Sequence, residues 1–212
     1  MNTEPFPAID PADAEVVAAQ LGRPLRGRCA VAHRCRCGLP DVVQTAPRLP
    51  DGTPFPTLYY LTCPRASAAA GTLEASGMMA AMTQRLAADE ELRRGYAAAH
   101  LDYAARREAV ARACGAEPLP AGTQSAGGMP DRVKCLHTLI AHELVTGANP
   151  LGREAAEAAV EVAGEWWRAG PCVPRSGSGP AGAAAAVEAA LDSGAAAPGG
   201  SAAAAAAGRS GS

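Results

Sequence analysis

TLYYLTC, residues 57–63, is the stretch that decides the fold class of this chain. Its β-branched and aromatic residues are the types that strands favour, so we expect a strand here. Directly after it, Pro64 opens an Ala-rich region in which apolar residues recur at helical spacing. A strand that ends where helical sequence begins indicates an α+β protein whose sheet comes first.

Two more strands are predicted upstream of this one. Apolar and polar positions alternate in RGRCAVAHRCRCG, residues 26–38, so that Cys29, Val31, His33 and Cys35 share one face. A short strand follows near residues 42–45, and the residues PDG, 50–52, form a turn. Pro-rich connections favour a small antiparallel sheet.

The helices are predicted from end signals and apolar spacing. Asp10 and Pro11 are a capping residue and a first-turn proline, and they start a helix that ends near Leu21. Beyond Pro64, helices are expected at 66–76, 78–87, 89–114, 130–147 and 151–169. The predicted fold class is therefore α+β, with a small N-terminal antiparallel sheet packed on four to five helices.

Composition predicts the domain organisation. We expect an N-terminal arm at 1–12, a single α+β domain at 13–170 and a disordered Ala/Gly/Ser tail at 171–212, because that tail buries too little apolar surface to fold. The formal net charge is −2 and no basic run occurs, which argues against nucleic acid. The acidic start MNTEPFPAID and the lack of a long, strongly apolar run predict a cytoplasmic protein without membrane insertion.

The segment GGMPDRVKCLHTLIAH, residues 127–142, draws attention because it holds the only lysine of a chain that otherwise uses arginine. If a helix begins at Pro130, the apolar residues Val133, Leu136, Ile140 and Leu144 form its core stripe. The opposite stripe then carries Asp131, Lys134, Cys135, Thr138 and His142. A solvated polar face would explain this stripe equally well.

An anion site is one interpretation of this segment. The N-terminus of the predicted helix offers free N–H groups and partial positive charge, and Lys134 and Arg132 add cations. Gly128, next to Gly127, allows close approach of the backbone to a ligand. Phosphate or carboxylate groups are the expected ligands.

A metal site is a second interpretation, with Cys35, Cys63 and Cys135 as candidate ligands and His137 as a substitute for Cys135. Zinc suits thiolate and imidazole ligands, and an iron–sulfur cluster is the weaker alternative. On a helix, Cys135 and His137 would point apart by about 160°. We therefore expect the strand cysteines to complete the site.

Nucleophilic chemistry is a third interpretation. A thiol at the start of a helix has a depressed pKa, so Cys135 is a candidate nucleophile, with His142 or His33 as its base. Asp131 and His137 are further acid–base candidates. We expect the strand ends near Cys35 and Cys63, the turn Pro54–Thr57 and the start of the predicted helix at 130–147 to converge on one pocket.

Three stretches carry a family resemblance: GLPDVVQTAPRLPDGTPFPTLYYLTCP (38–64), SAGGMPDRVKCLHTLIAH (125–142) and GANPLG (147–152). Together they resemble the uncharacterised bacterial DUF family numbered 501, common in actinobacteria, over about residues 14–155. The resemblance implies a family pattern centred on Cys35, the PFPT turn, Cys63 and the DRVKCLH segment. The position of Cys63 is His in some members, which favours zinc over an iron–sulfur cluster, and Cys37 lies outside the pattern.

The resemblance also implies a functional setting. Members are often encoded near a septum-formation protein and an exopolyphosphatase-type enzyme. We therefore expect a metal- or anion-binding regulatory or accessory module, linked to cell division or polyphosphate metabolism through a cell-division or phosphatase-type partner. The alternative is a hydrolase or transferase that acts on a phosphorylated small substrate.

Overall fold

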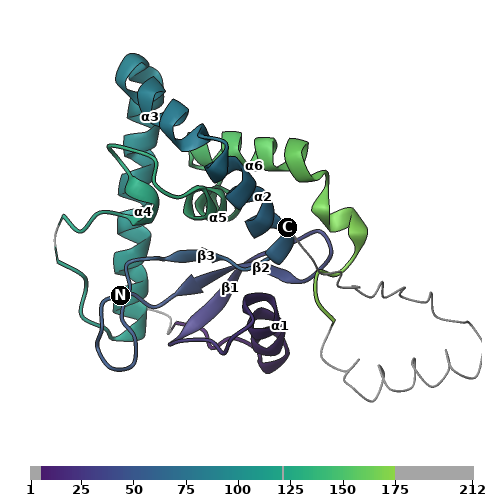
Figure 1. Ribbon diagram of the computed structural model, residues 1–212. Coiled ribbons are helices and arrows are strands. Elements are labelled where there is room, and N and C mark those ends of the chain that lie inside the picture. Colours follow the sequence, from purple (N-terminus) through teal and green to yellow (C-terminus); the bar gives the residue numbers. More distant parts are fainter. Residues whose placement is uncertain (1–5, 121, 175–212) are drawn as a thin grey trace, which may run out of the picture. The chain divides into compact units, whose positions relative to one another are not determined.

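A three-stranded antiparallel sheet forms the N-terminal part of the protein, whose computed structural model describes residues 6–120 and 122–174. The strands are β1 (Cys29–Arg34), β2 (Pro40–Thr45) and β3 (Tyr59–Leu61), in the order β1-β2-β3 (Figure 1). In the central strand, Val43 pairs with Val31 on one side and with Tyr60 on the other. The predicted small N-terminal antiparallel sheet is confirmed.

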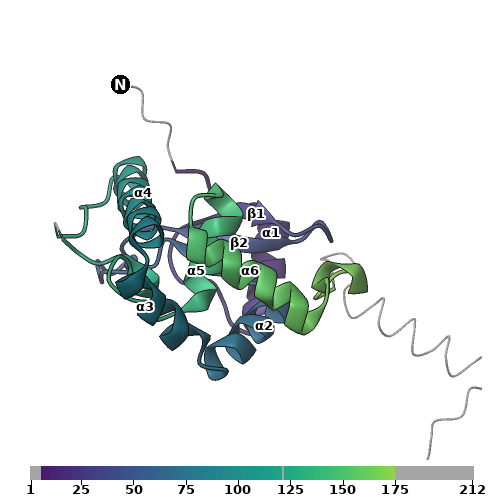
Figure 2. The ribbon, with the colours of Figure 1, turned by 90° about the horizontal axis from the view of Figure 1, so that it is seen from above.

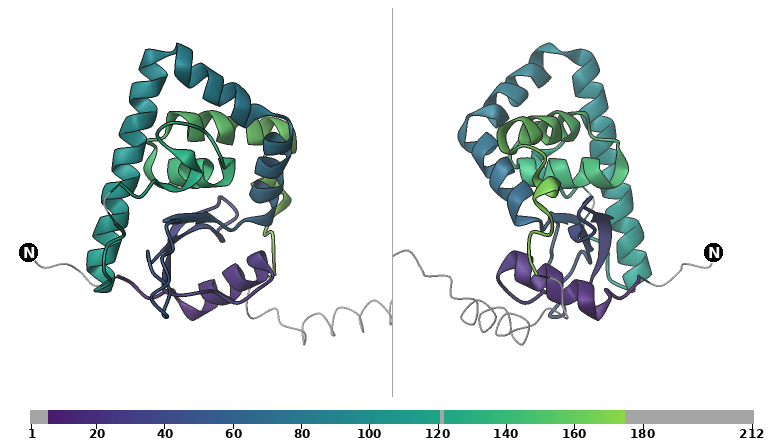
Figure 3. Two further views of the ribbon diagram at one scale, coloured as in Figure 1. Left: turned by 60° about the vertical axis from the view of Figure 1, so that its left-hand side comes forward. Right: turned by 90° about the vertical axis from the view of Figure 1, so that its right-hand side faces the viewer.

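Helices cover both faces of this sheet. Val43 packs with Val17 of α1 (Pro11–Leu21), whereas Val42 and Leu61 belong to the larger core on the opposite face. That core contains α5 (Leu136–Thr146), which the views of Figure 3 place on the side of the sheet away from α1. The alternation of side chains along each strand thus builds two cores of unequal size.

The remaining helices surround α5 on its outer side (Figure 2). They are α2 (Pro64–Ala75), α3 (Met78–Ala88), α4 (Glu90–Cys114) and α6 (Pro150–Ala163), with short 3-10 turns at Ala126–Gly128 and Trp166–Ala169. The predicted α+β class is confirmed. Within the described residues, no helix has both the length and the apolar character needed to cross a membrane.

Local end signals place most helices where the sequence predicts them. Asp10 accepts a hydrogen bond from the N–H of Ala12 at the start of α1. Asp89 accepts one from the N–H of Leu92 at the start of α4, which ends at Gly115 with φ of 64°. Short polar side chains satisfy free amides at helix starts, and glycine tolerates the left-handed conformation at helix ends.

The prediction that a helix begins at Pro130 is wrong, because α5 starts six residues later, at Leu136. Residues 127–134 fold into a turn: the N–H of Lys134 donates to Gly127 O at 2.7 Å, and that of Arg132 to Gly128 O at 3.2 Å. The N–H of Val133 donates to Thr83 Oγ1 at 3.0 Å. Local and tertiary hydrogen bonds therefore satisfy these amides without a helical turn.

The predicted polar stripe on this helix is also wrong, because α5 is buried on both sides. Thr138 is 7% exposed and His142 is fully buried. His142 Nε2 lies 3.0 Å from Asp102 Oδ2, and its Nδ1 accepts from Asn149 Nδ2 at 3.3 Å. These partners let an imidazole replace an apolar residue in the core.

The predicted tail, 171–212, lies outside the described residues from residue 175 onward, as do residues 1–5 of the predicted arm. Pro171 and Cys172 of that predicted tail contact the domain. Arg65 donates hydrogen bonds to the carbonyl oxygens of Gly170 and Pro171, and Gln20 Nε2 lies 3.3 Å from Cys172 Sγ.

Candidate functional site

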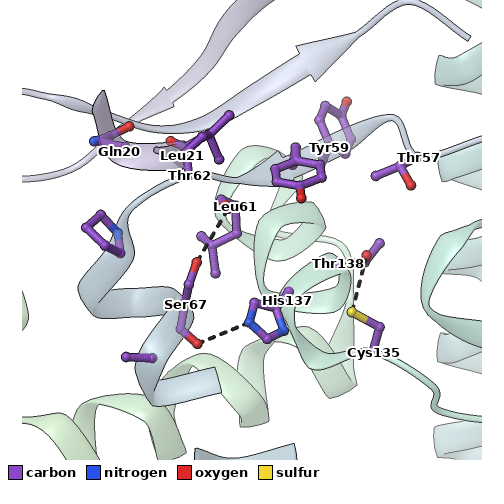
Figure 4. Close-up of a pocket in the computed structure, with 13 residues that line it drawn as sticks. Gln20, Leu21, Thr57, Tyr59, Leu61, Thr62, Ser67, Cys135, His137 and Thr138 are labelled. Atoms are coloured by element: carbon purple, nitrogen blue, oxygen red, sulfur yellow. Dashed lines mark hydrogen bonds between the residues drawn. The ribbon is translucent and has the colours of Figure 1, made fainter. Parts of the chain in front are cut away.

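A pocket of about 760 Å³ opens between β3, the start of α2 and the start of α5 (Figure 4). Three residues predicted for the site, Thr57, Cys135 and His137, line it together. Strand β3 supplies one wall, and the first turns of α2 and α5 supply the opposite one. Of the segments expected to converge, the turn at Thr57 and the start of α5 line this pocket, whereas Cys35 and Cys63 do not.

A cluster of three metal-ligating side chains forms at this pocket. An imidazole nitrogen of His137, the sulfur of Cys135 and a carboxylate oxygen of Glu74 all lie within 4.8 Å of one another, the only such group among the described residues. His137 Nδ1 is 3.0 Å from Glu74 Oε1. Its Nε2 donates to the carbonyl oxygen of Ser67 at 3.1 Å.

The helix boundary explains why Cys135 and His137 meet. Cys135 precedes α5 in an extended conformation, with φ of −155° and ψ of 112°, and His137 is the second helical residue. The expectation that the two side chains point about 160° apart holds only if both are helical. It is wrong here, and the cluster forms without the strand cysteines.

Hydrogen bonds within the cluster shift the pKa values of all three side chains. Hydrogen bonding to Cys135, followed by Glu74, raises the pKa of His137 to about 9 against the opposing effect of burial. Burial by itself would raise the pKa of Cys135, but hydrogen bonds to His137 and Thr138 outweigh it and lower that pKa. The same holds for Glu74, where His137 and the Leu136 N–H outweigh burial and lower the pKa. The cluster thus favours a protonated imidazole beside two anionic groups.

The carboxylate of Glu74 occupies the N-terminus of α5. The N–H of Leu136 donates to Glu74 Oε1 at 2.7 Å. Lys134 and Arg132 are exposed, and neither residue lines the pocket. The carbonyl oxygens of Gly127 and Gly128 bind the turn that follows them, and a side chain at Gly128 would lie 3.0 Å from Lys134 Cγ. The predicted anion-binding set, Lys134, Arg132 and Gly128, is therefore not assembled at the pocket.

The two strand cysteines lie outside the cluster of Glu74, Cys135 and His137. Burial is the main cause that raises the pKa of Cys35 to about 12 and that of Cys63 to about 11. Metal ligation needs a thiolate, so burial disfavours that state at both positions. The structure thus places Cys35 and Cys63 in the apolar core and does not join them to Cys135.

The predicted acid–base residues other than His137 are also elsewhere. His33 pairs with Asp41, with 2.7 Å between Nδ1 and Oδ1, and His142 is held by Asp102 and Asn149. Asp131 is exposed and lines a different hollow, next to Thr83. The imidazole beside Cys135 is that of His137.

Sequence reasoning missed Glu74. It is the only acidic residue of α2, PRASAAAGTLEA, which is a weak signal because isolated acids on helices are common. Its partner His137 lies 63 positions away in the chain. No local spacing links the two, so only the packing of α2 against α5 reveals the cluster.

Comparison with known proteins gives one match. The model of the family described as "Protein of unknown function (DUF501)" matches residues 31–157, which is well over half of the chain. The matched range includes β2, β3 and most of β1, together with Glu74, Cys135 and His137. Neither the curated proteins nor the solved structures that were searched contain a match. The chain therefore belongs to the DUF501 family.

Proposed function

We propose that the protein is a metal-dependent small-molecule-binding module, in which Glu74, Cys135 and His137 hold a divalent transition metal at the pocket. The observation that carries the proposal is the convergence of these three side chains around His137 Nδ1. A regulatory or accessory role is the part of the proposal supported by the pocket lining, which offers binding groups but, among the described residues, no acid–base carboxylate.

The hydrogen bond made by His137 Nε2 supports the assignment of Nδ1 as the metal-binding atom. Nε2 donates to the Ser67 carbonyl, and Nδ1 of the protonated imidazole lies 3.0 Å from Glu74 Oε1, where it donates its proton. A divalent cation that displaced this proton would lie between the same two donor atoms. Metal-bound histidines are typically anchored in this way, through the other ring nitrogen to a carbonyl or carboxylate.

The donor set favours zinc among the divalent metals. One sulfur, one nitrogen and one oxygen match the ligand types that zinc takes, and bond lengths of about 2.0–2.3 Å place such atoms about 3–4 Å apart. Three protein ligands leave a fourth position for water or another molecule. Cys135 and His137 line the pocket, so a metal between them is accessible from it.

Zinc titration of metal-free protein tests the proposal. We expect one equivalent to bind, and cobalt(II) in its place to give the thiolate-to-cobalt charge-transfer absorption of a sulfur-ligated ion. Cys135→Ser should lower zinc affinity by at least about tenfold and remove the cobalt band. Cys114→Ser changes a partly buried cysteine outside the cluster and should bind as the unchanged protein does. Equal zinc affinity in both variants would refute the assignment.

A thiol nucleophile is the second candidate function, favoured by the lowered pKa of Cys135 beside His137. In this form the protein is a hydrolase or transferase: the thiolate attacks an electrophilic carbon of the substrate, the bond from that carbon to the leaving group breaks, and the leaving group takes a proton from the His137 imidazolium. Iodoacetamide should then alkylate Cys135 faster than Cys114 in metal-free protein at pH 7. A reaction no faster than that of Cys114 would remove this candidate.

The partner and the compartment stay predictions. A cell-division or phosphatase-type partner and a cytoplasmic location rest on the family resemblance and on composition.

A further inference from the structure

The pocket has a second polar end, opposite Cys135, where Gln20 and Thr62 lie (Figure 4). Gln20 belongs to α1 and is 8% exposed, and Thr62 follows β3 and is 1% exposed. Gln20 Oε1 and Thr62 Oγ1 are buried and have no hydrogen-bond partner among the described residues. The third such side-chain atom, Trp166 Nε1, does not line this pocket.

The orientation of the Gln20 amide is fixed by its other contacts. Nε2 donates to the carbonyl oxygen of Pro40 at 2.7 Å and lies 3.3 Å from Cys172 Sγ. Rotating the amide by 180° would place an oxygen against the Pro40 carbonyl, which has no proton to share. Oε1 is therefore the atom that lacks a partner, and it requires a donor.

The rest of the lining determines the charge of a ligand. Among the described residues that line the pocket there is no Lys, Arg, Asp or Glu. Apart from the Cys135–His137 end, its walls come from Leu21, Leu61 and Pro64 together with neutral polar groups. A phosphate or a carboxylate would find no cation at the Gln20 end, where burial makes an unpaired charge costly.

We infer that this pocket binds an uncharged carboxamide, whose N–H donates to Gln20 Oε1 and whose carbonyl oxygen accepts from the Thr62 hydroxyl. An amide presents these two complementary groups side by side, and it satisfies both buried atoms at once. The rest of the ligand extends between the apolar walls toward Cys135 and His137. The inference rests on the proposed function in taking this pocket as the functional one.

Three compounds of similar shape test the ligand class. Benzamide is the carboxamide, and benzoate and acetophenone are its controls. Benzoate replaces the amide by an anion, and acetophenone keeps the carbonyl oxygen but has no N–H. Binding is followed by protein NMR chemical shifts at millimolar ligand concentrations, with and without zinc. We expect benzamide to bind at least about tenfold more tightly than either analogue, since each leaves a buried polar atom unsatisfied.

Thr62→Val is the matched variant, because it keeps the shape and removes only the hydroxyl. We expect it to weaken benzamide binding by about tenfold and to raise the melting temperature, since the removed hydroxyl has no partner in the free protein. Equal binding of the three compounds, binding of none, or unchanged benzamide affinity in Thr62→Val would overturn the inference. Benzamide contacts at Gln20 do not require the metal. Selective benzamide binding without zinc binding would refute the metal site alone. Zinc binding without selective benzamide binding would refute the ligand class alone.

Discussion

The contact between α5 and α6 predicts a large effect of one methyl group at Gly152. A Cβ atom built on this helical glycine would lie 2.2 Å from the carbonyl oxygen of Leu139 and 2.9 Å from Glu143 Cβ. Real contacts of this kind are about 1 Å longer, so Gly152→Ala forces the two helices apart. Leu139, Leu151 and Ala155, which are fully buried in the same core, would lose contact.

Over-packing of this kind costs about 1–3 kcal/mol, and the upper end applies because a backbone oxygen cannot rotate away. Alanine has a higher helix propensity than glycine, which offsets up to about 1 kcal/mol of this loss in the free energy of unfolding. We expect a net loss of about 2–3 kcal/mol in the free energy of unfolding. In a domain of this size that loss lowers the melting temperature by about 4–12 °C.

Thermal and urea unfolding followed by circular dichroism provide the measurement. The control is Gly71→Ala in α2, where an added Cβ meets nothing within 4 Å. That variant should gain up to about 1 kcal/mol from helix propensity alone. If Gly152→Ala were as stable as Gly71→Ala, the close approach of the two helices at Leu139 would be refuted.

Three further predictions concern the buried histidine and the metal site. Burial, opposed by Asp102, lowers the pKa of His142, so the unfolded chain binds its proton more readily; the contribution of His142 to stability should be present above about pH 6.5 and be lost below it, by up to about 1.4 kcal/mol per pH unit. The raised pKa of His137 acts in the opposite direction above about pH 6.5, so the slope should appear in the difference between the unchanged protein and His142→Gln in urea unfolding from pH 8 to 5. Asn149→Ala removes both the cap of α6 at the Gly152 N–H and the donor to His142 Nδ1, so it should cost about 2–4 kcal/mol in the same assay. Zinc at about 100 times its dissociation constant should add about 2.7 kcal/mol to the free energy of unfolding, and a chelator should reverse this gain; an unchanged melting temperature would contradict it.

Local signals in the sequence were sufficient for the fold class. Asp10, Asp89 and Gly115 mark helix ends through contacts with their own neighbours, so they predict α1 and α4 well. The 57–63 stretch predicts β3, although only Tyr59–Leu61 pairs with β2. Such features depend on residues a few positions apart.

The start of α5 could not be predicted because non-local contacts decide it. Pro130 is a common first residue of a helix. Here the N–H of Val133 donates a hydrogen bond to Thr83, and that of Leu136 donates one to Glu74. These acceptors lie about 50 and 60 residues earlier in the chain. The same boundary determines whether Cys135 meets His137, so an error of six residues in the helix start led to the expectation that the two side chains point apart.

Glu74 also has a structural role, because it connects two helices at the edge of the pocket. One carboxylate oxygen binds both the first N–H of α5 and the imidazole of His137, so it ties α2 to α5 at the cluster. The two helices cannot slide past each other without separating these atoms. A metal ion bound as we propose would therefore meet a preorganised site and need little rearrangement of the backbone, which favours tight binding.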